Sequence, residues 1–400
     1  MYRRIFTRAT VWFSLAGLVG RLPISMIGLG IVLLAEHTTG SYAVAGSLSA
    51  TAMIANAVLA IPQGRLMDRL GQGVVLRVVI TVWGAGLAGA MVSLEADWPR
   101  WTAYVLAAVS GAALPSVGTC ARARWAHALV GDESALHTAF SFEAAVDEMV
   151  FIIGPVAVTL LATGVDPIAG LVTALVTGLG GTYVFAGLRS SEPPAHPRTA
   201  ATETRAPIPW GAIGVLSVHT CALGVLFGAA EVVTVAFAQE HGHESVAGLL
   251  LACWSFGSLV AGLLSGVYAG RVDQRTMLWI GALGMSVSSV PLLWIPSIPW
   301  MAVALLIGGL TISPTLIAAM SLAKQALPAS RMTEGMAFLN TGLALGVAPG
   351  AALAGVVIDA HGASTAYLVS LGGSVVALLA ALAVRMPTNV SDHERVAELA

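Results

Sequence analysis

The feature that most constrains this chain is a series of twelve apolar stretches, each able to cross a lipid bilayer as a helix. A spanning helix needs roughly 20 predominantly apolar residues. The stretches are continuous rather than alternating, which indicates helices and not outer-membrane strands. We therefore expect an all-α membrane protein with twelve transmembrane helices. The predicted spans are residues 11–35, 42–66, 78–94, 102–121, 138–163, 168–188, 210–237, 246–269, 277–295, 300–323, 335–358 and 365–384.

Composition excludes a water-soluble globule. Apolar residues make up 57% of the 400 residues and charged residues 10%, against about 25% charge in average soluble chains. Lys plus Arg (19) and Asp plus Glu (21) nearly balance, so no nucleic-acid partner is expected. Cys120, Cys221 and Cys253 all lie in apolar stretches. They read as buried hydrophobes, so we expect no disulfide, no metal site and no cofactor.

Positive charge is distributed unevenly between the two ends of the predicted spans. With the N-terminus inside, all but two of the 19 Lys and Arg residues fall in the tails or the even-numbered connections. The exceptions are Arg100, in an odd-numbered connection, and Arg21, inside the first span. The positive-inside rule then predicts a multi-pass protein of the cell inner (plasma) membrane with both termini in the cytoplasm.

A polar stretch between the sixth and seventh spans divides the chain. Residues 189–209 are rich in Pro, Ser, Glu and Arg, which is typical of a flexible linker. The predicted domains are an N-terminal six-helix bundle (1–188), a cytoplasmic linker (189–209), a C-terminal six-helix bundle (210–384) and a cytoplasmic tail (385–400).

The two halves share short patterns in the same order. Val-Ala-Gly opens the second span at residue 44 and the eighth at residue 246. Pro115 in the fourth span matches Pro314 in the tenth, and Leu-Gly-Gly occurs at 179–181 in the sixth span and 371–373 in the twelfth. Six-plus-six parallel repeats predict two pseudo-symmetric bundles that rock around a central site, as in alternating-access transporters.

The loop after the second span carries the most specific motif. Residues 64–73 read Gly-Arg-Leu-Met-Asp-Arg-Leu-Gly-Gln-Gly. This resembles the Gly-x-x-x-Asp-Arg-x-Gly-Arg-Arg/Lys signature of the major facilitator superfamily, without its final basic pair. The second-half copy keeps Arg271 and has Gly270 in place of the acid. On this resemblance the chain is identified as a member of the bacterial, twelve-helix type. The matching positions are Gly64, Asp68, Arg69 and Gly71.

The resemblance implies a gate. In the family, the acid of this loop holds the cytoplasmic gate by contacting the first turn of the eleventh span, here near residues 333–335. We therefore expect Asp68, together with Arg69, to belong to a gating loop. Loop charge that only sets the topology is the alternative.

The fifth span resembles a second family pattern in part. Proton-coupled drug antiporters carry Gly-x-x-x-Gly-Pro-x-x-Gly-Gly there, and only Gly154-Pro155 is kept. The departures weaken a drug-antiporter assignment. A helix kink at Gly154 and Pro155 is expected whatever the substrate.

Ionisable residues inside the spans are the most informative functional signal. An arginine at the bilayer centre costs roughly 2.5–3.5 kcal/mol. Arg21 in the first span and Asp147 and Glu148 in the fifth lie at a similar depth, so we expect Arg21 to pair with one of the two acids. Glu143 precedes Asp147 by four residues and shares its helix face, whereas Glu148 points about 100° away.

Several acids in one span allow two roles. One acid can neutralise Arg21 while another exchanges a proton, which is what a proton carrier requires. A static structural ion pair is the alternative. Glu231 in the seventh span is a further buried acid that either lines the cavity or pairs with another helix. His219, Trp254 and Asn340 are cavity candidates, and core or lipid-facing packing is the alternative for Trp254.

Together these features predict a secondary active transporter that moves a small organic solute by alternating access, with proton-coupled export preferred. An importer or facilitator of a sugar, amino acid or other metabolite is the alternative, and a non-transporting membrane sensor is a more remote one. No enzyme is expected, because the sequence has neither a nucleotide-binding loop nor a His-Glu-x-x-His motif. The expected partners are the solute, protons and the lipid bilayer, and the expected state is a monomer.

Overall fold

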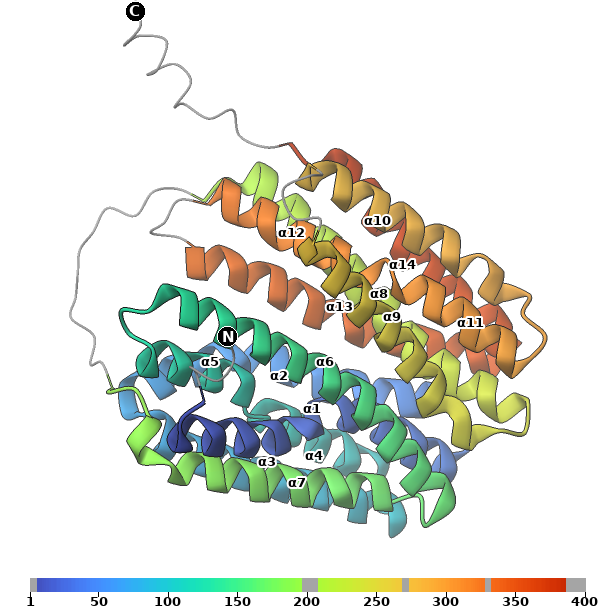
Figure 1. Cartoon of the computed structure of the whole chain (residues 1–400). Coiled ribbons are helices and arrows are strands. Elements are labelled where there is room, and N and C mark those ends of the chain that lie inside the picture. The colour runs from blue at the N-terminus through green and yellow to red at the C-terminus, as the bar shows by residue number, and fades with distance from the viewer. Residues whose placement is uncertain (1–5, 196–207, 268–272, 328–331, 386–400) are drawn as a thin grey trace, which may run out of the picture.

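Long helices make up nearly all of the structure. The computed structural model describes residues 6–195, 208–267, 273–327 and 332–385, and these ranges contain no strand. Within them, twelve helical segments are long and apolar enough to cross a membrane. They form two bundles that lie side by side, coloured blue to green and yellow-green to red in Figure 1. The expected all-α fold of two six-helix bundles is confirmed.

The first bundle is built from the helices that precede the linker. Gly71 alone connects its second and third helices with a φ of 88°, a backbone conformation that favours glycine. The helices are α1 (Arg8–Thr39), α2 (Tyr42–Leu70), α3 (Gln72–Glu95), α4 (Arg100–Ala113), α5 (Val117–Ala128), α6 (Glu133–Gly164) and α7 (Ala169–Gly187), followed by the short η2 (Arg189–Ser191).

The second bundle repeats this order after the linker. Its elements are α8 (Trp210–Glu240), η3 (Glu244–Val246), α9 (Ala247–Val267), α10 (Gln274–Ser289), η4 (Pro291–Leu293), α11 (Ile298–Gly309), α12 (Ile312–Ala326), α13 (Met332–His361) and α14 (Ala363–Ala383). We call the end of the molecule where α7 ends and α8 begins the linker end, and the opposite end the distal end (Figure 1).

Two predicted spans are broken helices, which corrects the expectation of one continuous helix in each. The fourth span consists of α4 and α5, separated at residues 114–116, and the tenth consists of α11 and α12, separated at residues 310–311. Proline explains both breaks, because its ring removes a backbone donor and clashes with the carbonyl four residues earlier. Pro115 lies within the first break, and Pro314 follows Leu310 by four residues.

Side chains of α2 satisfy backbone carbonyls beside the first break. Asn56 Nδ2 donates a hydrogen bond to the Leu114 carbonyl at 3.4 Å, and Gln63 Nε2 donates to the Ala112 carbonyl at 2.5 Å. Unsatisfied backbone groups are costly at membrane depth. The two amides therefore help the chain to tolerate a break inside the fourth span.

The bundles approach each other most closely through α2 and α13 at the distal end. Gly46 of α2 lies against the carbonyl of Ala351, and Gly355 of α13 lies against the carbonyl of Tyr42, so a Cβ on either glycine would clash. Near the linker end, by contrast, a Cβ on Gly64 of α2 would meet none of the described atoms within 4 Å. Helices α2 and α13 therefore pack backbone to backbone at the distal end, whereas Gly64, near the linker end of α2, packs against no described atom.

The Leu-Gly-Gly tripeptides mark equivalent helix contacts in the two halves. Gly181 of α7 packs against the backbone of Gly20 in α1, and Gly373 of α14 packs against the backbone of Ala222 in α8. The preceding glycine of each pair faces open space. Small residues allow this close approach of helix backbones in a membrane.

The Gly181→Ala substitution should destabilise the protein by about 1–3 kcal/mol, because the added methyl group would collide with Gly20. Gly180→Ala is the matched control, since its Cβ meets nothing within 4 Å in the described structure. Alanine is the better helix former by about 1 kcal/mol, so the control should be neutral or slightly stabilising. Thermal unfolding of the purified variants measures the difference, and equal melting temperatures would contradict this packing.

Candidate functional site

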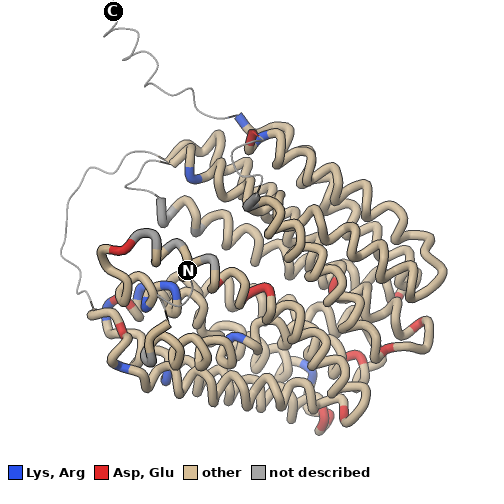
Figure 2. The backbone as a smooth tube through the Cα atoms, in the orientation of Figure 1, with Lys and Arg blue, Asp and Glu red and all other residues tan. Residues whose placement is uncertain are grey.

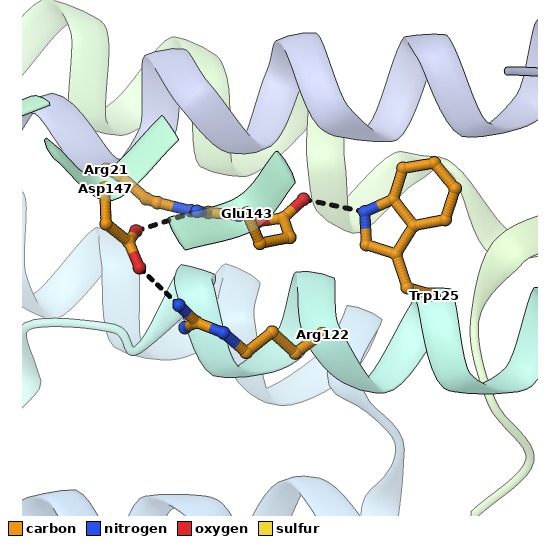
Figure 3. Close-up of polar contacts among 5 residues, drawn as sticks. All are labelled: Arg21, Arg122, Trp125, Glu143 and Asp147. Carbon is orange, nitrogen blue, oxygen red and sulfur yellow. Dashed lines mark hydrogen bonds and ion pairs between the residues drawn. The ribbon is translucent and has the colours of Figure 1, made fainter. Parts of the chain in front are cut away.

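Arg21 lies in a charge cluster inside the first bundle. Charged residues are sparse between the two ends of the helices (Figure 2), and only 4% of the Arg21 side chain is exposed. Its Nη2 donates to Glu143 and its Nη1 donates to Asp147 Oδ1 at 2.9 Å, both acids belonging to α6 (Figure 3). The expected pairing with an acid of the fifth span is confirmed for Asp147, and Glu143 is a second partner.

Helix α5 supplies two further donors. Arg122 Nη2 donates to Asp147 Oδ2 at 2.5 Å, and the indole Nε1 of Trp125 donates to Glu143 Oε1 at 2.7 Å (Figure 3). Each of the four carboxylate oxygens therefore has a donor. Satisfied polar networks of this kind fix the helices that contribute to them, here α1, α5 and α6.

The cluster is electrically neutral and exposed on one side only. Two guanidinium groups balance two carboxylates, which is the condition under which buried charge is tolerated. The Arg21–Glu143 pair is sealed, with side-chain exposures of 4% and 1%. Asp147 and Arg122 are 34% and 39% exposed. Asp147 therefore bridges the buried Arg21 and the partly exposed Arg122.

The sequence pattern does not identify Arg122 and Trp125, because the predicted fourth span ends at residue 121. The break at Pro115 lets α5 continue to Ala128 and pack across α1. Gly118, in the first turn of α5, lies beside the guanidinium of Arg21. The three-residue spacing of Arg122 and Trp125 places both on one helix face, and this is the signal that could have found them.

Two acids lie where the bundles face each other, and neither forms an ion pair with any residue that the structure describes. Glu148 of α6 interacts with Ser313 of α12, whose hydroxyl is hydrogen-bonded to that of Ser258 in α9 at 2.8 Å. Glu231 of α8 points at Gly28 of α1, where an added Cβ would lie 2.9 Å from Oε1. Each acid reaches towards the opposing bundle.

The signature loop lies at the linker end. Gly64, Asp68 and Arg69 are exposed, and in the described residues neither charged side chain forms a hydrogen bond or an ion pair. The side chains of residues 333 and 334 lie outside the described part of the chain, so the expected contact between Asp68 and the start of α13 stays a prediction. Arg271 also lies outside the described residues.

Gln72, which stands at one of the two basic positions of the family signature, forms a polar contact of its own. Gln72 accepts a hydrogen bond from Arg124 Nε at 3.1 Å. Arg124 is fully buried and its Nη1 also donates to Ser191 Oγ at 2.9 Å. Its guanidinium lies 3.8 Å from the ring centre of Phe185, a favourable cation–π distance. Arg124 thus ties α5 to the signature loop and to the start of the linker.

The remaining candidates lie in the second bundle and do not contact the Arg21 cluster in the described structure. His219 is fully buried, with its Nδ1 2.8 Å from the Ala377 carbonyl of α14. Trp254 packs edge-on against Phe227 and lines a small cavity within the second bundle. Asn340 is exposed on α13.

Gly154 and Pro155 form a helix contact beside the cluster. Helix α6 passes through Pro155 without a break. A Cβ on Gly154 would collide with the hydroxyl of Ser25 in α1, and this hydroxyl donates to the Val150 carbonyl at 2.8 Å. The pair therefore brings α1 and α6 together next to Arg21, and the kink stays a prediction.

Among the described residues, twelve helical segments able to cross a membrane form two repeated bundles, which defines the class as a multi-pass membrane protein. The family model of the Major Facilitator Superfamily matches residues 13–238 and 215–399. The chain belongs to the major facilitator superfamily and is a transporter rather than an enzyme.

Solved transporter structures share the fold. A mutant of the nucleoside transporter NupG superposes with a TM-score of 0.73 at 14% identity, covering 94% of this chain and 100% of that one. A bacterial homologue of the iron transporter ferroportin in an inward-facing state gives 0.71 at 14% identity, with 94% and 99% covered. An auto-inhibited peptide transporter of the POT family gives 0.65 at 16% identity, with 96% and 98% covered. No curated protein matches the sequence.

Replacing Arg21 with Met should destabilise the protein by about 3–5 kcal/mol, because it leaves two carboxylates with a single arginine. Adding Glu143→Gln to this variant restores charge balance and should recover part of the loss. Unfolding of the two single variants and the double variant forms a double-mutant cycle that measures the coupling. A double variant no more stable than Arg21→Met would contradict the paired arrangement.

Proposed function

We propose that this transporter exports a small organic solute from the cytoplasm in exchange for protons. The observation that carries the proposal is the position of Glu231, at the bundle interface against Gly28 and without a cationic partner in the described structure. An ionised carboxylate at this depth needs a counter-charge, and a proton is the smallest one. An acid that is alternately exposed to the two sides then carries a proton across.

The acids inside the predicted spans fall into two groups, those paired with an arginine and those without such a partner among the described residues. The carboxylates of Glu143 and Asp147 are balanced by Arg21 and Arg122, so we assign this cluster to holding the first bundle together. Glu148 and Glu231 have no such balance within the described residues. We therefore assign proton exchange to these two acids, with Glu231 first because it faces the opposing bundle across a glycine.

The distribution of positive charge gives the expected orientation in the membrane. All but two of the 19 Lys and Arg residues belong to the tails or to the even-numbered connections, which by the positive-inside rule places these segments, and with them the linker end, on the cytoplasmic side of a plasma membrane. Helices α2 and α13 pack closely at the opposite, distal end. A site that opens to the cytoplasm can load a solute there, as export requires, or release one there, as import requires. The same site driven by a reversed gradient would import, which is the alternative.

The test begins with a solute. Nucleosides, peptides and organic anions form a first panel, because structurally similar transporters are named for these classes. The panel compound that most raises the melting temperature of the purified protein becomes the probe. Its transport is then followed in proteoliposomes, with and without a pH gradient.

Glu231→Gln should abolish accumulation driven by the pH gradient, because an amide cannot exchange a proton at this site. Solute–solute exchange at equal pH should stay within about twofold, since rocking of the bundles needs no net proton movement. Glu148→Gln should show the same pattern more weakly, and Glu95→Gln, an exposed acid at the distal end, is the control. If both Glu231→Gln and Glu148→Gln keep gradient-driven accumulation, the proposed coupling is wrong.

A further inference from the structure

The start of α2 is capped by a residue from the other bundle. Asp359, in the last turn of α13, accepts hydrogen bonds from Ser41 Oγ at 2.7 Å and from the backbone N–H groups of Tyr42 and Ala43 at 2.9 and 3.0 Å. The first N–H groups of a helix have no partner within the helix and carry partial positive charge. A carboxylate is the side chain that best satisfies both conditions.

Each backbone N–H group in the first turn of α2 has a hydrogen-bond acceptor. Asp359 takes the N–H groups of Tyr42 and Ala43, and the hydroxyl of Ser41 takes that of Val44 at 3.3 Å. The following N–H, of Ala45, makes the first bond within the helix at 3.1 Å. The cap of α2 is therefore shared between its own N-cap residue and a carboxylate that belongs to the opposing bundle.

A second set of hydrogen bonds crosses the same part of the interface. The hydroxyl of Tyr42 is hydrogen-bonded to Gln239 Oε1, near the end of α8. The amide of Gln239 in turn donates from Nε2 to Glu36 Oε1 in α1 at 3.1 Å. One glutamine of the second bundle is thus held by two helices of the first.

We propose that Asp359 and Gln239 form a distal latch, which holds the bundles together at the distal end in this conformation and opens once in each transport cycle. The latch acts where α2 and α13 pack closely through Gly46 and Gly355. Asp359 is exposed, so water can replace it at the helix end when the bundles part. Exposed contacts of this kind are individually weak, as a contact that breaks in every cycle must be.

The geometry gives α2 and α13 reciprocal ends. The two helices are antiparallel, and each carries an acid close to its C-terminal end, Asp68 in α2 and Asp359 in α13. Asp359 reaches the first turn of the partner helix here, whereas Asp68 is exposed and, among the described residues, unpaired. In the opposite conformation Asp359 loses its contacts with α2.

Distances between spin labels in the full chain, reconstituted in lipid nanodiscs, test the latch. Cys120, Cys221 and Cys253 are replaced by serine or alanine. One pair of labels, at Val165 and Trp294, reports on the distal end, and a second pair, at Val130 and Arg275, reports on the linker end; all four positions are exposed. Asp359→Ala should raise the population that is open at the distal end about fivefold, the effect of losing a typical helix cap.

Glu240→Ala is the matched control. Glu240 also caps a helix at the distal end, because its Oε1 accepts from the backbone N–H of Ala363 at 2.7 Å, but both residues belong to the second bundle. Its loss should lower stability without moving either label distance. Asp359→Asn keeps one capping oxygen but loses the charge and the acceptor for the other donors, so its distal distances should lie between those of the wild type and Asp359→Ala.

Two results would overturn the latch: unchanged distal distances in Asp359→Ala, or an equal change in Glu240→Ala. Should Asp359→Ala not fold, Tyr42→Phe gives the same measurement, because it removes only the hydrogen bond to Gln239. Its expected effect is a rise of about threefold in the distally open population, the equivalent of one ordinary hydrogen bond. An unchanged distribution in that variant would likewise refute the latch.

Discussion

The rest of this structure depends on the high free energy of an unpaired charge in hydrocarbon. Arg21 is tolerated inside the first bundle because two acids of α6 face it and a second arginine balances the count. That requirement fixes the rotation of α1 and α6 about their own axes. It also leaves Glu148, one residue after Asp147, turned about 100° away towards the second bundle. The same helix rotation therefore places Asp147 in the ion-pair network and Glu148 at the interface, where it interacts with Ser313.

The break in the fourth span brings two side chains of α5 into the charge cluster. Without the break at Pro115, Arg122 and Trp125 would continue the line of α4; with it, α5 starts afresh beside α1 and delivers both side chains to the acids of α6. The carbonyls exposed next to the break are taken up by amides of α2. The proline is tolerated because hydrogen bonds from a neighbouring helix replace those that the backbone loses.

The spans, the repeats and the pairing of Arg21 can be predicted from the sequence, because each follows from the positions of residues along the chain. Apolar length gives the helices, matching tripeptides give equivalent contacts at Gly181 and Gly373, and equal depth gives the Arg21–Asp147 pair. Sequence reasoning misses Arg122, because a helix break changes direction in three dimensions. It also misses Asp359, because the cap on α2 joins residues more than 300 positions apart, through the relative placement of two bundles.

The cap at the start of α2 and the Arg21 cluster both pair a carboxylate with positive charge, and they differ in their access to water. The first N–H groups of a helix need hydrogen-bond acceptors and attract negative charge. A single carboxylate on the partner helix meets both needs, and it joins the two bundles at the same time. Water competes for such a cap, whereas it does not reach the Arg21–Glu143 pair, of which only 4% and 1% are exposed. In the proposed mechanism the Arg21–Glu143 pair stays sealed within the first bundle, and the Asp359 cap, which breaks, lies between the bundles where water can replace it. This difference in water access is what allows one contact to hold a bundle together and the other to open in each cycle.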